Sequence, residues 1–201
     1  CKKLIISRSK KDGSGSAENT LGDGLTTNNV YGTRVQDKEI SLNQPDVVKV
    51  LAVYESSTTG DPNLPSISLI NRSAELTDTI QGELVVGENS GATAQVVTKA
   101  AGAVDIVYTN DVQFEREEIV TFQSSGIVGQ VSVVTQGDKE ITKSFIFDDG
   151  QRDGFYGLSK ITRKESGAAP QNPIMIVFDY FTHGAGNNFT GVASYPDLSP
   201  E

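Results

Sequence analysis

Residues 147–156 read FDDGQRDGFY, and residues 176–184 read IVFDYFTHG. The first stretch is typical of a strand that runs into an acidic turn punctuated by glycines, and the second is typical of a densely aromatic strand. Residues 174–181 are apolar on both faces, which indicates a central strand covered on both sides. Together the two stretches predict β structure with a polar loop.

The composition fits this fold class and narrows the range of partners. With 201 residues the chain can bury a core without disulfides, and its 20 glycines are typical of short strands joined by many turns. The formal net charge of −9 repels phosphate backbones, so we expect no nucleic-acid partner. No stretch approaches the ~20 apolar residues that a membrane helix needs, so we also expect no insertion into a membrane.

The strand pattern extends through the chain. No window combines sustained helical periodicity with helix caps, so the sequence predicts an all-β protein. Residues 47–54 are β-branched and aromatic, and we expect this strand to share a sheet with residues 174–181. Residues 67–70 are a further strand candidate.

An internal duplication lies between these strands. Residues 83–96 align with residues 118–131 at an offset of 35 positions, with Glu, Val, Ser-Gly and Gln-Val in register. Each copy predicts a strand, a Ser-Gly turn and a second strand, because glycine tolerates positive φ and serine bonds to turn backbone. Two copies are too few for a solenoid, so we expect the halves of a small barrel or sandwich. Chance similarity in a segment rich in Val, Ser and Gly is the alternative.

These observations predict three parts. Residues 1–28 would be an extended N-terminal arm. Residues 29–73 and 137–196 would form an outer module resembling a β-sandwich, and residues 74–136 a smaller inserted β-barrel or sandwich. The basic start of the arm would either dock on an acidic partner surface or remain a solvated tail; its cations are Lys2, Lys3, Arg8, Lys10 and Lys11.

The residue types needed for catalysis or for metal binding are scarce. His183 is the only histidine and Cys1 the only cysteine, so a Ser-His-Asp triad or a zinc site lacks its partners. We therefore expect a structural role for His183 at a strand end. The sequence predicts no catalytic, cofactor-binding or metal-ligating residues, and no cofactor.

The acidic turn has a superficial likeness to a calcium loop. Its third ligand position holds Gln151 in place of Asp or Asn, and its twelfth holds Lys160 in place of a bidentate Glu. We expect instead an ordinary turn in which carboxylates bond backbone amides and Arg152 pairs with one of them. The carboxylates concerned are those of Asp148, Asp149 and Asp153.

Two further groups of residues allow alternative functions. A glycoside hydrolase needs paired carboxylates, which could come from Asp148 and Asp149 or from Glu115, Glu117 and Glu118. Acidic residues are abundant here, so such pairs also arise by chance. A set of aromatic residues would either pack in the core or stack on sugars. The set consists of Phe178, Tyr180, Phe181, Phe189 and Tyr195.

Three stretches resemble a family of large structural proteins encoded by tailed phages, notably myovirus-type cyanophages. They are residues 30–42 (VYGTRVQDKEISL), 147–156 (FDDGQRDGFY) and 178–183 (FDYFTH). Residues 87–92 (GENSGA) also resemble small β modules frequent in such tail proteins. The resemblance spans about residues 30 to 195. Members of the family are usually much longer, so we expect this sequence to be a piece of a longer protein.

The resemblance implies a non-enzymatic structural component of a phage tail, baseplate or tail fibre, located in the virion tail. Such a protein would act through contacts with other virion proteins and with copies of itself, and a trimer is one closed arrangement open to it. The alternative is a receptor- or glycan-binding adhesion module for the host surface, which predicts exposed aromatics in a groove. A third hypothesis, a virion polysaccharide hydrolase, predicts two carboxylates facing each other in a cleft.

Overall fold

The computed structural model describes residues 2–6, 35–152 and 155–181. Within these ranges the chain is all-β, which confirms the predicted fold class, and neither of its two 3₁₀ turns could span a membrane. The turns are η1 (Leu76–Asp78) and η2 (Thr142–Ser144). The strands are β1 (Lys2–Ile6), β2 (Glu39–Ser41), β3 (Val47–Glu55), β4 (Ser66–Ile70), β5 (Leu84–Gly87), β6 (Thr93–Lys99), β7 (Val104–Tyr108), β8 (Ile119–Phe122), β9 (Val128–Thr135), β10 (Lys139–Glu140), β11 (Phe145–Asp148), β12 (Gln151–Arg152), β13 (Phe155–Tyr156), β14 (Lys160–Arg163) and β15 (Ile174–Tyr180).

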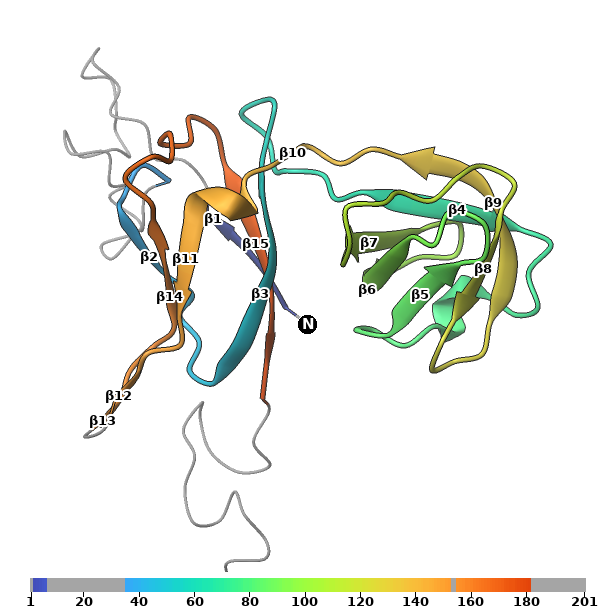
Figure 1. Ribbon diagram of the computed structural model, residues 1–201, viewed down its shortest axis with the longest axis horizontal. Helices are drawn as coiled ribbons and strands as arrows, with labels where there is room; N and C mark the ends of the chain where they lie inside the picture. Colours follow the sequence, from blue (N-terminus) through green and yellow to red (C-terminus); the bar gives the residue numbers. More distant parts are fainter. Residues whose placement is uncertain (1, 7–34, 153–154, 182–201) are drawn as a thin grey trace, which may run out of the picture.

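Two antiparallel sheets form a sandwich, as Figure 1 shows. One sheet has the strand order β1-β15-β3-β10, and it faces a three-stranded sheet with the order β11-β14-β2. Alternate side chains of both sheets point into a shared apolar core, as expected for strands with one buried face. The fully buried side chains of this core include Ile40, Ile161, Ile174, Ile176 and Phe178.

Strand β15 is the centre of the molecule. It pairs with β1 along one edge and with β3 along the other, and every residue from Ile174 to Phe178 is buried. Ile174, Ile176 and Phe178 face the sandwich core, whereas Met175 and Val177 face the other way and pack against the second module. The predicted pairing of β15 with β3, and its burial on both faces, are confirmed.

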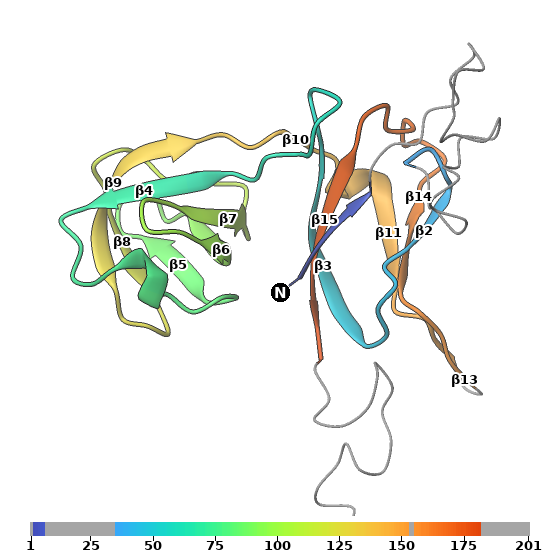
Figure 2. The same ribbon diagram turned by 180° about the vertical axis from the view of Figure 1, so that it is seen from behind.

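The second module is a closed barrel with the strand order β4-β7-β6-β5-β8-β9, inserted between β3 and β10 (Figure 2). The expected boundary at residue 74 is wrong, because β4 belongs to the barrel rather than to the sandwich. β4 is hydrogen-bonded to β7 and β9, and its Ile67 and Leu69 side chains lie in the barrel core.

The barrel consists of two interlocked repeats. Both predicted hairpins are present, as β5-β6 and β8-β9, and each repeat gains a preceding strand, β4 or β7. The pairing of β5 with β8 sets Val85 opposite Phe122 and Gly87 opposite Val120. Val85 corresponds to Val120 and Gly87 to Phe122 at the 35-position offset, so a local two-fold axis relates the two copies. The turn glycines predicted to take positive φ do so in both copies, at 69° for Gly91 and 72° for Gly126.

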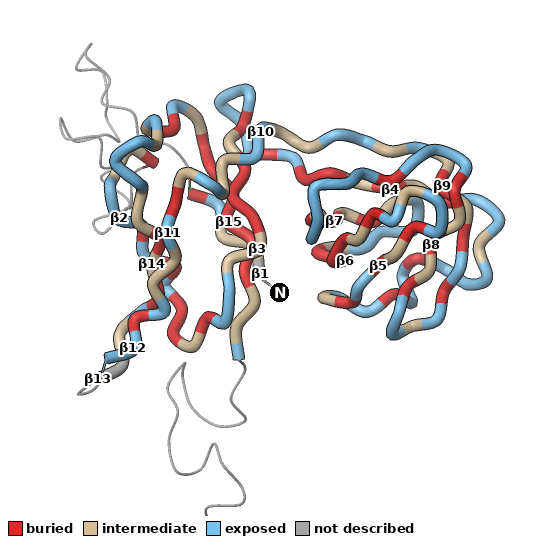
Figure 3. Tube along the Cα trace, viewed as in Figure 1, coloured by how far each residue is buried: buried red, intermediate tan, exposed pale blue. Residues whose placement is uncertain are grey.

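An apolar interface joins the barrel to the sandwich. The barrel packs on the face of the four-stranded sheet that points away from the sandwich core, and Figure 3 shows buried residues along β3 and β15 at this junction. Burial, with the charges of Glu140 and Tyr108, raises the pKa of Tyr54, which keeps its hydroxyl neutral. The interface residues are Ala52, Tyr54, Leu64, Val97, Val107, Met175 and Val177.

The two connections between the modules are tied together by Asp138. Its carboxylate accepts hydrogen bonds from the backbone amides of Asn63 (2.7 Å) and Ser57 (3.1 Å). Burial alone would raise the pKa of Asp138, but these hydrogen bonds outweigh it and lower the pKa below its ordinary value. Neighbouring Gly137 must lack a side chain, because a Cβ there would lie 2.6 Å from the backbone nitrogen of Pro65.

The start of the chain differs from the expected extended arm. Residues 2–6 form β1, an edge strand of the sandwich, while residues 7–28 lie outside the described ranges. Lys3 docks on the chain's own barrel, with its Nζ 3.2 Å from Thr98 Oγ1 and 3.8 Å from Asp105 Oδ2. Five backbone pairs with β15 explain why this short segment is ordered as a strand.

We predict that Ile176→Ala lowers the free energy of unfolding by about 2–5 kcal/mol, because it opens a cavity under a fully buried side chain. Ile146→Ala, at a position that is 55% exposed on β11, is the matched control and should cost less than about 0.5 kcal/mol. Urea unfolding measures both variants. Equal losses would contradict the central position of β15.

Candidate functional site

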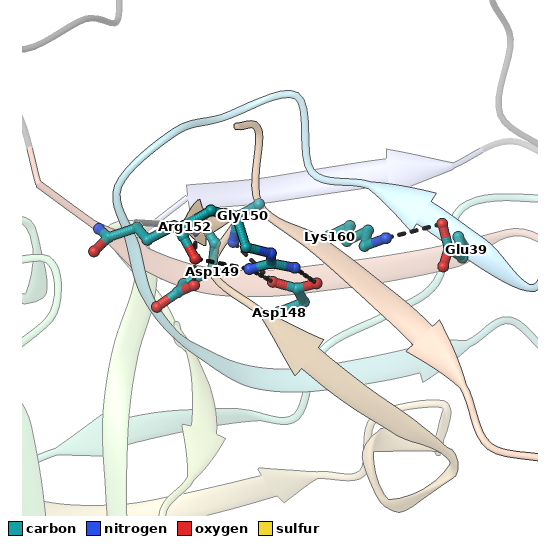
Figure 4. A network of polar contacts seen from close by, with 8 residues as sticks. Glu39, Asp148, Asp149, Gly150, Arg152 and Lys160 are labelled. Carbon is teal, nitrogen blue, oxygen red and sulfur yellow. Dashed lines mark hydrogen bonds and ion pairs between the residues drawn. The ribbon is translucent and has the colours of Figure 1, made fainter. Parts of the chain in front are cut away.

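The acidic turn after β11 is the most conspicuous polar feature of the sandwich. Asp148 Oδ1 accepts a hydrogen bond from the backbone amide of Gly150, and Asp149 Oδ1 accepts one from that of Gln151, both at 2.9 Å. Arg152 forms a two-bond pair with Asp148, at 2.7 Å and 3.1 Å, as Figure 4 shows. The predicted turn is confirmed for these residues, and Asp153 lies outside the described part of the chain.

The local fold requires this arrangement. Gly150 has φ of +78°, and a Cβ there would lie 2.7 Å from the backbone oxygens of Gly157 and Leu158. The side chain of Ser159, which is buried, donates a hydrogen bond of 2.8 Å to the Asp149 carbonyl. The turn is therefore locked to the opposite arm of the same hairpin, which continues beyond the sheet as β12 and β13 (Figure 1).

The charges around the turn are paired. The Arg152 guanidinium and the Gly150 amide lower the pKa of Asp148 to about 2. Across the outer face of the sheet, Lys160 Nζ lies 2.9 Å from Glu39 Oε2 (Figure 4). The position expected for a twelfth calcium ligand thus holds a lysine engaged with Glu39. Among the described residues, no cluster of three or more His, Cys, Asp or Glu side chains is arranged to hold a metal ion.

The barrel contains two buried glutamates that the sequence reading did not single out as a pair. Glu83 and Glu118 are the first residues of the two duplicated segments, and they are 4% and 1% exposed. Each carboxylate caps the turn of the other copy. Glu118 accepts from the amide of Ser90 at 3.2 Å and from its hydroxyl at 2.9 Å, and Glu83 accepts from the amide and hydroxyl of Ser125 at 2.8 Å and 3.0 Å.

Each of these carboxylates also binds the backbone just before its own strand. Glu83 accepts from the amide of Ile80, and Glu118 accepts from the amide of Glu115. Ile80 and Ser125, which donate to Glu83, correspond at the 35-position offset to Glu115 and Ser90, which donate to Glu118, so the duplication extends to a reciprocal clasp between the halves. The sequence alignment already set Glu83 opposite Glu118 and Ser90 opposite Ser125, which marked these residues as equivalent. It did not show that each glutamate binds the serine of the other copy.

The proposed catalytic carboxylates are not arranged as a facing pair. Glu118 is enclosed by the clasp, whereas Glu115 and Glu117 are exposed. Asp148 forms a salt bridge with Arg152, and Asp149 accepts a hydrogen bond from the backbone amide of Gln151 in the turn. A hollow of about 300 Å³ beside β10 and η2 is lined by Glu55, Glu140 and Asp111. Glu55 accepts a 2.6 Å hydrogen bond from the backbone amide of Gln171, Glu140 accepts one from the Thr142 hydroxyl, and Asp111 lies 3.8 Å from Lys143 Nζ. Apart from the exposed Glu115 and Glu117, these carboxylates are engaged with groups of the chain itself.

The aromatic set divides between the core and the surface. Phe178 is fully buried, and Tyr180 packs beside it with ring centroids 6.2 Å apart. Phe181, by contrast, is 65% exposed at the end of β15. Two residues of the set, Phe189 and Tyr195, lie outside the described residues, as does His183.

Comparison with known proteins found no relative of this chain. No family model, no curated protein and no solved structure matches the chain.

We predict that Ser90→Ala and Ser125→Ala each lower the free energy of unfolding by about 1–3 kcal/mol, because each leaves a buried carboxylate short of a donor. Ser124→Ala is the control, since this exposed residue gives Glu83 only its backbone amide. It should change stability little. Thermal and urea unfolding measure all three variants, and a loss confined to one half of the barrel would contradict a reciprocal clasp.

We also predict that Asp148 titrates near pH 2 in the folded protein, below its usual pKa of 3.8. Because the folded-state pKa is lowered, the stabilisation is complete above pH 3.8 and is lost as the pH falls through about 2. Replacing Arg152 with Ala should move the titration up toward the usual value. Carbon-detected NMR of the side-chain carboxyl measures it, and an unchanged midpoint would show that Arg152 does not hold the charge.

Proposed function

We propose that this protein is a non-enzymatic structural component of a phage tail, baseplate or tail fibre, located in the virion and acting through contacts with other virion proteins and with copies of itself. The observation that carries the proposal is that the most conspicuous polar side chains of the described chain bind other groups of the same chain. The Asp148–Arg152 pair shapes a hairpin, and Glu83 and Glu118 close a barrel. A building block needs side chains that fix its shape.

The architecture is consistent with a rigid building block. Two modules are joined by two connections, an apolar interface and polar links, so they resist bending relative to each other more than a single linker would. One polar link is the 3.0 Å hydrogen bond from Gln95 Nε2 on β6 to Asp179 Oδ2 on β15. Another is the Lys3 contact with Thr98 and Asp105. A rigid unit suits a closed symmetric assembly, in which every copy makes the same contacts.

A second candidate is the receptor- or glycan-binding adhesion module. The observation in its favour is the exposure of Phe181 at the tip of β15, where an aromatic ring can stack on a sugar. The burial of Phe178 and the packing of Tyr180 against it favour the structural role, because these rings are used in the core.

The structural role predicts a fixed position in the particle. We expect antibodies raised against the folded chain to label the tail, baseplate or fibres of purified particles of the encoding phage in electron micrographs. Mass spectrometry of the same particles should recover the chain, and particles lacking its gene should assemble incomplete tails. Absence of the chain from purified particles would overturn the proposal. Blocking of host adsorption by the antibody, with tails complete in its absence, would favour adhesion.

A further inference from the structure

Strand β1, at the start of the described chain, completes the sandwich by pairing with β15, near its end. It pairs in antiparallel register with β15, from Lys2 opposite Phe178 to Ile6 opposite Ile174. Leu4 and Ile6 pack on the sandwich core, and Lys3 reaches the barrel. The pairing with β15 and the Lys3 contacts with the barrel both reach segments more than 90 positions further along the chain.

Removal of β1 would uncover the most buried strand of the protein. β15 lies between β1 and β3, so without β1 its backbone amides and carbonyls on one side would lose their partners. The apolar side chains that β1 covers would be exposed as well. An unpaired edge of this kind is a template for an added strand, and the backbone bonds do not depend on which molecule supplies it.

The tether to β1 is long. Ile6 ends the strand, and Val35 is the next residue that the structure describes, which leaves 28 residues between them. A chain of that length can span at most ~100 Å, several times the width of a sandwich. In an assembly, a neighbouring copy held beside this edge of β15 presents an identical Lys2–Ile6 segment, so the two segments compete for the same edge.

We propose that β1 is exchanged between copies of this chain, each copy completing its neighbour's sheet in the groove along β15. The occupant of the groove is a second copy's Lys2–Ile6 segment, in the register seen here. This inference rests on the proposed function, since exchange supplies the self-association that a virion component requires. Reciprocal exchange gives a closed dimer, and exchange in one direction around a ring gives a trimer or larger ring.

Cysteine pairs across the junction test the exchange. Ile5 lies opposite Met175, and opposed residues in antiparallel strands have Cα separations within disulfide range. Two full-length variants, Ile5→Cys and Met175→Cys, each also carry Cys1→Ser. They are unfolded, mixed in equal amounts, refolded at up to about 1 mM and oxidised. We expect a disulfide-linked band of twice the chain mass in the mixture, absent from either variant alone.

Controls make a negative result informative. The double variant Ile5→Cys/Met175→Cys should form its disulfide in either case, which shows that the geometry permits the bond. Lys3→Cys with Val177→Cys provides a second pair in the same register. If the double variants cross-link and neither mixture does, exchange is overturned.

Light scattering on the unmodified chain separates this result from the proposed function. Oligomers without a mixed cross-link would overturn exchange and leave self-assembly standing by another surface. A monomer at every concentration, with no mixed cross-link, would count against both. A mixed cross-link that appears together with oligomers supports both.

Discussion

The structure depends on the burial of β15 on both faces. Ile174, Ile176 and Phe178 fill the core of the sandwich, and Met175 and Val177 fill the interface with the barrel. Because successive side chains of a strand point to opposite sides, one segment can hold two cores in a fixed relation. To fill both cores, residues 174–178 must be apolar on both faces of the strand. The strand also makes its neighbours necessary, since its edges need β1 and β3 to satisfy their backbone groups.

In the barrel, two repeats close around a small core, and this closure depends on two buried carboxylates. Burying a carboxylate is costly unless donors surround it, and each of Glu83 and Glu118 has amide and hydroxyl donors from the opposite repeat. The clasp couples the halves, because neither turn is satisfied without the other repeat's glutamate. Gly87 shows how tightly the clasp is packed, since a Cβ there would lie 2.5 Å from Glu118 Oε2.

Polar residues, among them the candidate catalytic carboxylates Asp148 and Glu118, serve this architecture. The Asp148–Arg152 pair, the Asp138 clasp and the two barrel glutamates all bind backbone amides within the chain. This pattern, with the resemblance to tail proteins, supports our proposal of a building block. Under that proposal the edges of its sheets would be the sites of assembly, and β1 lies at one of these edges.

The sequence by itself determined the all-β class, the burial of β15 on both faces and the duplicated hairpins, because these follow from local periodicity and turn residues; the pairing of β15 with β3 was an expectation that only the structure could confirm. It also predicted the bonds of Asp148, Asp149 and Arg152, which join neighbours in the chain. Only the tertiary structure assigned β4 to the barrel, placed residues 2–6 in the sandwich and crossed Glu83 with Ser125. Those outcomes depend on pairing between distant segments, and a strand's own residues do not specify which edge completes its hydrogen bonds.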